Sequence, residues 1–379
     1  MSQSLASILT GSPERAHALA PYDGRITARL SQTFVTASST AADFAEATRL
    51  AHLALRQDPT AVRAVITLGL NAQVRGDVAG ARRLYAYADT LSRRESQTQL
   101  WAIEDAVARN DIPGALRQYD IALRTSRTAP DLLFPVLAAA VDDPAIRAAL
   151  AQTLASDPVW GPSLTLYISA HSDPAAAVNL FRSLPRAGGK VTDEPRARLI
   201  NRLISNGSFA EAWNYYSDIA SKADRRMSRD PRFEADLAIP TPFDWVLVDS
   251  DGISSLIQPG ERGGVFDFSA PASVGGPALQ QMQMLPPGDY RLEGHSDGID
   301  QPEGSRPYWM LSCHDGRELG RVVMPNSVQA KGAFSGRFTV PAGCLAQMLT
   351  LIIRPSDSVS GVAGSINQIR LLPAHRPVR

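Results

Sequence analysis

Small and aromatic side chains recur at one fixed interval between residues 41 and 127. The recurring positions, each series spaced by 34 residues, are Ala47, Ala81 and Ala115; Ala54, Ala88 and Ala122; and Ala51, Tyr85 and Tyr119. Helix axes approach closely only where the side chains at the crossing are small. A repeat of this length therefore predicts helical hairpins that stack side by side and share one continuous core.

Turn-forming residues separate the two helices of each predicted hairpin. Gly76-Asp77 ends the first helix of one hairpin, and Asn110-Asp111 stands at the same place one period later. Both Gly and Asn tolerate the left-handed conformation that a helix C-terminus needs. The pattern then decays, and it returns around Asn206-Gly207. Tetratricopeptide (TPR) units have this period, so we predict a TPR-like α-solenoid.

The hydrophobic period changes from about 3.6 to 2 after Phe243. Short alternating segments such as YRLEGH and YWMLSC are separated by turn groups such as Asp315-Gly316. Eight or more strands spaced by about 8–12 residues predict a β-sandwich or jelly roll. The chain is thus predicted to be a multidomain α + β protein. Its predicted parts are an α-solenoid at 1–222, a linker or interface segment at 223–241, and an antiparallel β-sandwich at 242–379.

Charge and hydropathy exclude some classes of protein. Lysine plus arginine and aspartate plus glutamate each number 38, so the formal net charge is zero. A nucleic-acid-binding protein normally has a basic excess, and we expect no such partner. No apolar run reaches about 18 residues, so we expect no membrane span. The N-terminus lacks a signal-peptide pattern. We expect a periplasmic or cell-envelope protein if Met1 follows a removed signal or anchor, and otherwise a cytoplasmic one.

The two cysteines, Cys313 and Cys344, lie 31 residues apart in the predicted β domain. An even number of cysteines in one domain permits a disulfide, which would indicate an oxidising compartment. Two buried free thiols that behave as small hydrophobic groups are the alternative. The sequence leaves both open.

Several motifs resemble those of a bacterial cell-envelope family that joins a TPR array to a jelly roll similar to carbohydrate-binding modules. They are Leu68-Gly69 with Gly76-Asp77, SRRESQTQLW, GALRQYDIALR, FDW, LPPGDYRLEG, YWMLSC and FTVPAGCLAQMLTL. Genes of this family tend to lie beside exopolysaccharide genes. The resemblance implies a scaffold or adaptor that binds a protein of the envelope machinery for exopolysaccharide biosynthesis or secretion. A carbohydrate-binding protein that uses the C-terminal domain is the alternative.

Catalytic motifs of the H-E-x-x-H, P-loop and G-x-S-x-G types are missing from the sequence. We therefore expect no enzyme, no cofactor and no metal. A polysaccharide hydrolase or lyase would need two carboxylates in one cleft, and Glu293 with Asp297 or Glu303 is the grouping to consider. The acidic loop 297–303 is either a Ca²⁺ site or a solvated polar turn.

Alternation along three predicted strands places polar side chains on one face, provided that these strands are neighbours. The candidate glycan-binding residues are Gln281, Gln283, Arg291, Glu293, His295 and Tyr308. The wet side of an ordinary antiparallel sheet gives the same alternation. Trp245 and Trp309 alternate with apolar residues, which favours the core.

The inner wall of the predicted solenoid is the expected surface for a protein partner. The first helices of the second and third hairpins would project onto this wall. The candidate partner-binding residues are Arg63, Ile66, Leu70, Gln73, Gln97, Leu100, Glu104 and Val107. Some of these residues must instead pack between helices.

Overall fold

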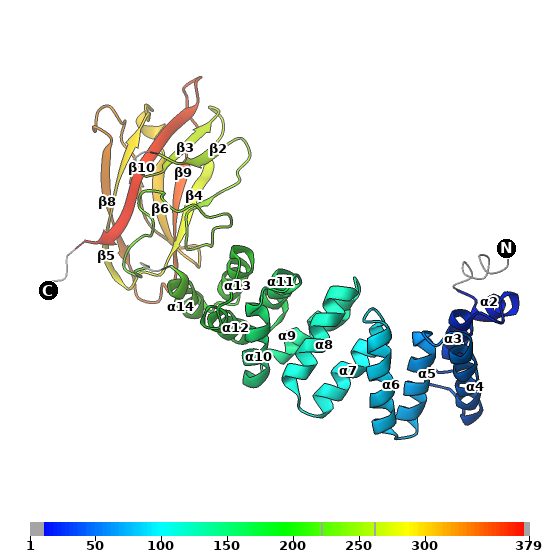
Figure 1. Ribbon diagram of the computed structural model, residues 1–379. Coiled ribbons are helices and arrows are strands. Elements are labelled where there is room, and N and C mark those ends of the chain that lie inside the picture. The colour runs from blue at the N-terminus through cyan, green and yellow to red at the C-terminus, as the bar shows by residue number, and fades with distance from the viewer. Residues whose placement is uncertain (1–10, 221–222, 261–262, 375–379) are drawn as a thin grey trace. The chain divides into compact units, whose positions relative to one another are not determined.

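The computed structural model describes residues 11–220, 223–260 and 263–374. Helices joined by short connections occupy residues 13–219, and two antiparallel sheets follow, so the predicted fold class is confirmed (Figure 1). The backbone divides into two units, Met1–Tyr167 with Arg182–Lys190, and Ile168–Phe181 with Val191–Arg379. The last helical hairpin therefore belongs to the same unit as the sheets. The predicted boundary at residue 222 lies outside the described residues.

The helices follow one another with short connections. Their bounds are α2 Pro13–Leu19, α3 Gly24–Thr33, α4 Ala41–Gln57, α5 Val62–Val74, α6 Val78–Leu91, α7 Ser96–Ala108, α8 Ile112–Thr125, α9 Ala129–Ala140, α10 Pro144–Ala155, α11 Gly161–His171, α12 Pro174–Arg186, α13 Asp193–Ser205 and α14 Phe209–Ile219. Helix α5 packs against α6, and α7 against α8, as predicted for the hairpins. Helix α4 packs against α3, which precedes the predicted repeat. Among the described residues, no helix is both long and apolar enough to cross a membrane.

The recurring residues pack where helices meet. All of the repeating alanines and both tyrosines are buried. A Cβ atom on Gly69 would come within 2.9 Å of the ring of Tyr85, so the ring occupies the space that a larger residue at 69 would fill. The same ring stacks on Trp101 of the next hairpin, with 4.4 Å between the ring centroids. The 34-residue period thus records contacts both within a hairpin and between neighbouring hairpins.

The turns at 76–77, 110–111 and 207–208 share one geometry. In each, the backbone N–H of the second residue donates to the carbonyl five residues earlier, at 2.9 Å. The first residue has a positive φ, with values of +78°, +56° and +76° at Gly76, Asn110 and Gly207. Glycine and asparagine adopt this conformation with little strain. The predicted return of the hairpin pattern near residue 207 is confirmed.

The alanine repeat yields a direct test of packing. We expect Ala88→Leu to lower the free energy of unfolding by about 1–3 kcal/mol, because Ala88 is fully buried between helices and three extra carbon atoms overpack the site. Ala86→Leu, two residues away on the exposed side of α6, is the matched control. Urea unfolding followed by circular dichroism measures both variants. Equal stabilities for the two variants would contradict the packing role of the repeat.

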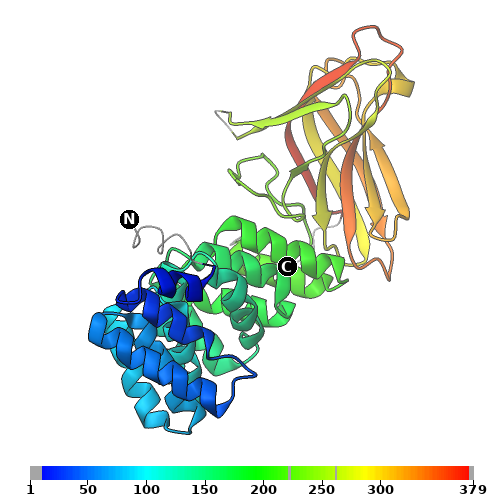
Figure 2. The ribbon, with the colours of Figure 1, turned by 90° about the vertical axis from the view of Figure 1, so that its right-hand side faces the viewer.

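The sandwich consists of two five-stranded sheets, whose side chains share one core (Figures 1 and 2). Sheet A has the order β1-β4-β9-β6-β7 and sheet B the order β2-β3-β10-β5-β8. The strands are β1 Val246–Leu247, β2 Ser254–Gln258, β3 Val265–Ala270, β4 Gly276–Gln283, β5 Gly288–Asp297, β6 Tyr308–Cys313, β7 Glu318–Val323, β8 Ala333–Val340, β9 Gln347–Ile353 and β10 Val362–Pro373. The predicted segments YRLEGH and YWMLSC lie on β5 and β6, and the turn group Asp315-Gly316 lies between β6 and β7, as predicted.

The core between the sheets contains the two tryptophans of the β domain. Trp309 is fully buried and Trp245 is 6% exposed, which confirms the prediction that both belong to the core. Cys313 and Cys344 are joined by a disulfide, with 5.6 Å between their Cα atoms. The structure therefore selects the disulfide over the pair of free thiols.

The predicted linker packs onto the sandwich. Strand β3 pairs with β10 only over residues 362–366, which leaves the adjoining edge of β10 open farther along. Two backbone bonds fill this edge, from the N–H of Ser228 to the carbonyl of Leu371 and from the N–H of Ile369 to the carbonyl of Pro231, both at 2.9 Å. Segment 223–241 thus packs on the edge of sheet B, and we call it the strap.

Candidate functional site on the outer face of sheet B

The structure brings together three of the six residues predicted to bind glycan. Arg291, Glu293 and His295 alternate with buried residues along β5, so their side chains share the outer face of sheet B. Strand β5 lies between β10 and β8. Of the three strands predicted to form the polar face, only β5 contributes to it. The strands beside β5 are β8 and β10, which are distant from it in sequence.

The expectation that Gln281 and Gln283 belong to the same face is wrong. They lie on β4 in sheet A, and both are fully buried. The amide of Gln281 exchanges two bonds of 3.1 and 3.2 Å with the backbone of Arg229 in the strap. Gln283 donates to the Oε1 atom of Gln281 at 2.7 Å. Their register partners on β9, Leu349 and Gln347, are buried too, so both glutamines lie inside the sandwich although their alternation matched that of an exposed face.

The prediction that Tyr308 shares this polar face is also wrong. It lies on β6 in sheet A and is only 9% exposed. The guanidinium carbons of Arg321 and Arg354 lie 5.0 and 4.6 Å from its ring centroid. Two cation–π contacts thus occupy the ring that was expected to carry a sugar.

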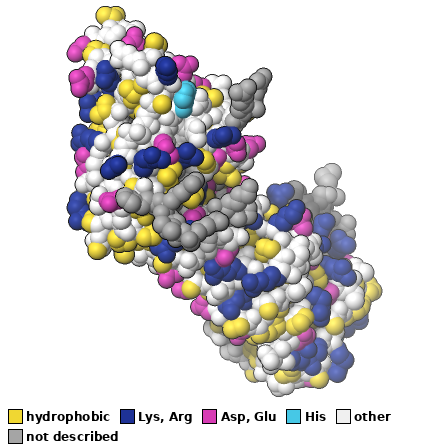
Figure 3. Space-filling view, turned by 90° about the vertical axis from the view of Figure 1, so that its left-hand side faces the viewer, with side chains coloured by type: hydrophobic (Ala, Val, Ile, Leu, Met, Phe, Trp, Pro, Cys, Tyr) yellow, Lys and Arg dark blue, Asp and Glu magenta, His cyan; other side chains and the backbone are white. Residues whose placement is uncertain are grey.

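Glu293 is the centre of the charged cluster on sheet B. Its two carboxylate oxygens lie 3.1 Å from an Arg291 nitrogen and 3.2 Å from an Arg370 nitrogen. Arg370 is the residue directly opposite Glu293 on β10, and Arg337 of β8 is directly opposite Arg291. We call Arg291, Glu293, His295, Arg337 and Arg370 the sheet B face. A row of basic side chains with acidic ones among them crosses this side of the sandwich (Figure 3).

The far end of the sheet B face carries polar groups with both donor and acceptor capacity. The ring Nδ1 atom of His295 lies 3.3 Å from the amide nitrogen of Asn367. Gln368 is opposite His295 in the register of β10. Gly332 permits this arrangement, since a Cβ atom there would lie 2.4 Å from the His295 ring.

Two cavities adjoin at Glu293 and Arg370, which line both of them. The smaller, about 420 Å³, lies over β5, β8 and β10, where His295, Ser335 and Gln368 line it. The larger, about 1080 Å³, lies between the strap and the end of β10. Together they follow the outer face of sheet B from His295 to the strap.

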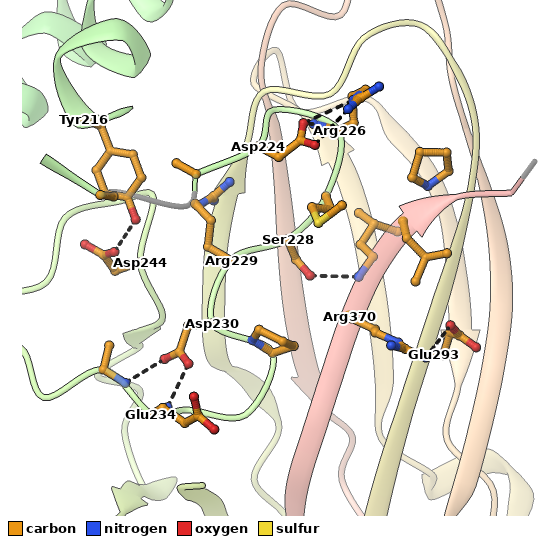
Figure 4. Close-up of a pocket in the computed structure, with 18 of the residues that line it drawn as sticks. Tyr216, Asp224, Arg226, Ser228, Arg229, Asp230, Glu234, Asp244, Glu293 and Arg370 are labelled. Carbon is orange, nitrogen blue, oxygen red and sulfur yellow. Dashed lines mark hydrogen bonds and ion pairs between the residues drawn. The ribbon is translucent and has the colours of Figure 1, made fainter. Parts of the chain in front are cut away.

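The strap forms the second wall of the larger cavity (Figure 4). Asp224 and Arg226 form an ion pair at 3.1 Å, and the hydrogen bond from Arg226 holds the pKa of Asp224 below its usual value. Asp230 accepts bonds from the backbone N–H groups of Glu234 and Ala235, at 2.7 and 3.1 Å. These carboxylates are already engaged within the strap.

A buried arginine of the strap, Arg229, fixes the strap to the rest of the sandwich unit. The guanidinium of Arg229 donates to the carbonyls of Phe243 and Met282 and lies against the rings of Trp213, Tyr216 and Phe243. Burial lowers the pKa of Arg229 to about 10, so the side chain stays charged at neutral pH. Burial likewise raises the pKa of the Tyr216 phenol, which donates to Asp244 at 2.6 Å.

The acidic loop does not gather its carboxylates. Asp297 accepts from the N–H of Gly298 at 2.8 Å, whereas Asp300 accepts from the amide of Asn326 at 3.2 Å. Within the part of the chain that the structure describes, no three His, Cys, Asp or Glu side chains form a metal-binding group. Glu293 and Asp297 are four residues apart on β5, so their Cα atoms lie about 13 Å apart. The paired carboxyl groups of glycosidases are about 5–9.5 Å apart.

The predicted partner-binding residues on α5 and α7 have different surroundings. Ile66 is fully buried in the core of its hairpin, so its prediction as a contact residue is wrong. The side-chain oxygen of Gln73 accepts a hydrogen bond from the Trp101 indole N–H at 2.6 Å. The Nε atom of Arg63 lies 3.9 Å from a carboxylate oxygen of Glu95. Leu70 and Leu100 are half-buried, while Gln97, Glu104 and Val107 are exposed. The exposed group is the part of the predicted surface that a partner can reach.

No family model and no curated protein matches the chain. Similar solved structures include yeast Tom70, at 15% identity and a TM-score of 0.27, covering 56% of this chain and 39% of that one. They also include the carbohydrate-binding module CBM6cm-2 from Cellvibrio mixtus lichenase 5A in complex with cellotriose, at 12% identity and a TM-score of 0.23, covering 35% and 98%. The chain spans only 20% of the bacteriophage CBA120 tailspike protein 4 domain that it also matches. Likenesses this weak say nothing about function.

Proposed function

We propose that this chain is a non-catalytic binding protein of the cell envelope. Its β-sandwich binds a polysaccharide across the sheet B face, and its helical hairpins bind a protein of the exopolysaccharide machinery. The observation that carries the first part is the pair of adjoining cavities that share Glu293 and Arg370. Planar groups with several donors and acceptors line them, and such groups can hydrogen-bond to sugar hydroxyls.

One arginine variant on each sheet tests whether the sheet B face binds the polysaccharide. We expect Arg370→Ala to weaken binding of the full chain to its polysaccharide about tenfold, because the change removes charge-assisted hydrogen bonds from the wall that both cavities share. Arg321→Ala is the matched control, since Arg321 pairs with Glu318 on the outer face of sheet A in a similar way. Affinity electrophoresis in gels that contain envelope polysaccharides measures both variants. Equal losses for the two would refute the assignment of the site.

The second part of the proposal rests on the exposed group of α7. Val107 is 62% exposed, and Gln97 and Glu104 are exposed on the same helix. These side chains are the reachable part of the predicted inner wall of the solenoid, the surface that helical repeats commonly offer to a partner. Cross-linking in native cells, followed by mass spectrometry, should join α7 to a protein of polysaccharide synthesis or export. Cross-links from α7 to unrelated proteins alone would refute this part.

A further inference from the structure

Strand β2 forms one edge of sheet B (Figure 1). It pairs with β3 along its whole length, from Ser254 to Gln258. Among the described residues, no strand pairs with the other side of β2, and no further backbone hydrogen bond reaches residues 254–258. An edge strand of this kind offers its outward N–H and C=O groups to a strand of another chain.

The other three edges of the two sheets are protected. Strand β1 has only two residues. Strand β7 carries Glu318 and Arg321, β8 carries Arg337, and these two edges pack against each other. Shortness, charge and coverage are means by which proteins keep an edge from pairing with another chain. Strand β2 has the sequence SSLIQ, five residues without a charge, a proline or a bulge. It is therefore the unprotected edge of the described sandwich.

Leu256 lies at the centre of this unprotected strand. Its neighbour Ile257 lies opposite Phe266, a fully buried core residue, so the side chain of Ile257 points into the sandwich. The side chain of Leu256 therefore points to the outer face, where it is 52% exposed. A second strand at this edge would cover part of the leucine as well as pair with the backbone.

We propose that β2 pairs antiparallel with the β2 strand of a second copy of this chain. A twofold axis at Leu256 places this residue opposite its own copy and Ser254 opposite Gln258. Any charge on the axis would meet itself, and like charges directly opposite each other destabilise a strand pair. Strand β2 has no charge. A strand that recognises a different protein has no such restriction, so the uncharged sequence favours pairing between copies.

The pairing joins two copies of sheet B into one continuous sheet. Directly opposite residues of antiparallel strands lie on the same face. Both copies of the sheet B face are thus on one side, and one long polysaccharide can contact both, which raises its apparent affinity. This consequence rests on the proposed glycan binding, whereas the strand pairing does not.

The test measures the oligomeric state of the full chain without saccharide. Two five-residue strands form a contact smaller than that of most stable dimers, so we expect a dissociation constant of about 10–100 µM in sedimentation velocity. Leu256→Glu should weaken the dimer at least about tenfold, because two carboxylates meet on the axis. Leu345→Glu is the matched control, since Leu345 is a 63% exposed leucine between β8 and β9. It should leave the dimer unchanged.

A mixture of two variants separates lost pairing from lost fold. Leu256→Glu mixed in equal amounts with Leu256→Lys should dimerise more tightly than either variant alone, because opposite charges then meet at the axis. A monomer at every concentration of the native chain would overturn the proposal. So would a Leu256→Glu dimer as tight as the native one, or a mixture no tighter than its components. Circular dichroism shows that the variants are folded.

The outcome does not depend on the proposed function, because the measurement contains no saccharide. A native chain that stays monomeric and still binds polysaccharide would overturn the strand pairing alone. A dimer that binds no polysaccharide would support the pairing and count against the proposed glycan binding.

Discussion

We expect Arg229→Ala to lower the free energy of unfolding of the unit that carries the sandwich by about 3–5 kcal/mol. Arg229 is only 8% exposed, and its guanidinium donates to two backbone carbonyls. Alanine would leave both carbonyls unpaired in a cavity that water enters poorly. It would also remove contacts with three aromatic rings, whose centroids lie 5.1 to 5.8 Å from the guanidinium carbon.

The loss of Arg229 would also weaken the contacts between three segments of the chain. Trp213 and Tyr216 belong to α14, Phe243 precedes β1, and Gln281 on β4 holds the backbone of Arg229. Arg229 thus joins the last helix, the strap and sheet A. We expect the variant to loosen the strap, which would appear as faster amide hydrogen exchange at Ser228 and Ile369.

Arg225→Ala is the control for this prediction, because Arg225 is exposed in the same segment. Urea unfolding followed by tryptophan fluorescence measures the stability of both variants. A loss below about 1 kcal/mol for Arg229→Ala, with unchanged exchange in the strap, would show that the buried guanidinium does not anchor this segment.

The second large effect concerns the disulfide. We expect Cys313→Ala combined with Cys344→Ala to lower the free energy of unfolding by about 3–4 kcal/mol, because the cross-link closes a 31-residue loop and restricts the unfolded chain. Both cysteines are buried in the core, so the change to alanine also removes the packing contacts of the two sulfur atoms. Thermal unfolding with and without a reductant measures the effect. Reductant should destabilise the native protein and leave the double variant unchanged.

The same pair of cysteines tests the proposed compartment. A disulfide persists in oxidising surroundings such as the periplasm and is reduced in most cytosols. Acid-quenched native cells should therefore contain the protein with both thiols blocked to alkylation. Quantitative alkylation of Cys313 and Cys344 would argue against a cell-envelope location.

The helical repeat could be predicted because its signal is local. Ala81 and Tyr85 pack within one hairpin and against the next, so a fixed interval in the sequence becomes a fixed contact in space. The same reasoning failed for Ile66. A helical period shows which residues share a face, but it does not show how deeply the neighbouring helix covers that face.

The site on sheet B could be predicted only along one strand. The alternation in β5 exposes Arg291, Glu293 and His295, but nothing local shows that the neighbours are β8 and β10. Arg337 and Arg370 were therefore missed, although alternation within their own strands marks both as outward. Gln281 and Gln283 gave the opposite error, because both are buried opposite Leu349 and Gln347 of β9, and the strap bonds to Gln281. Strand order and coverage depend on long-range packing, which periodicity does not encode.

A crystal structure of the full chain, soaked with an oligosaccharide that it binds in affinity electrophoresis, tests the central claim most directly. We expect saccharide density across β5 and β10, within hydrogen-bond distance of Glu293 or Arg370. Density at the loops that end the sandwich, or over sheet A beside Tyr308, with none on the sheet B face, would contradict it.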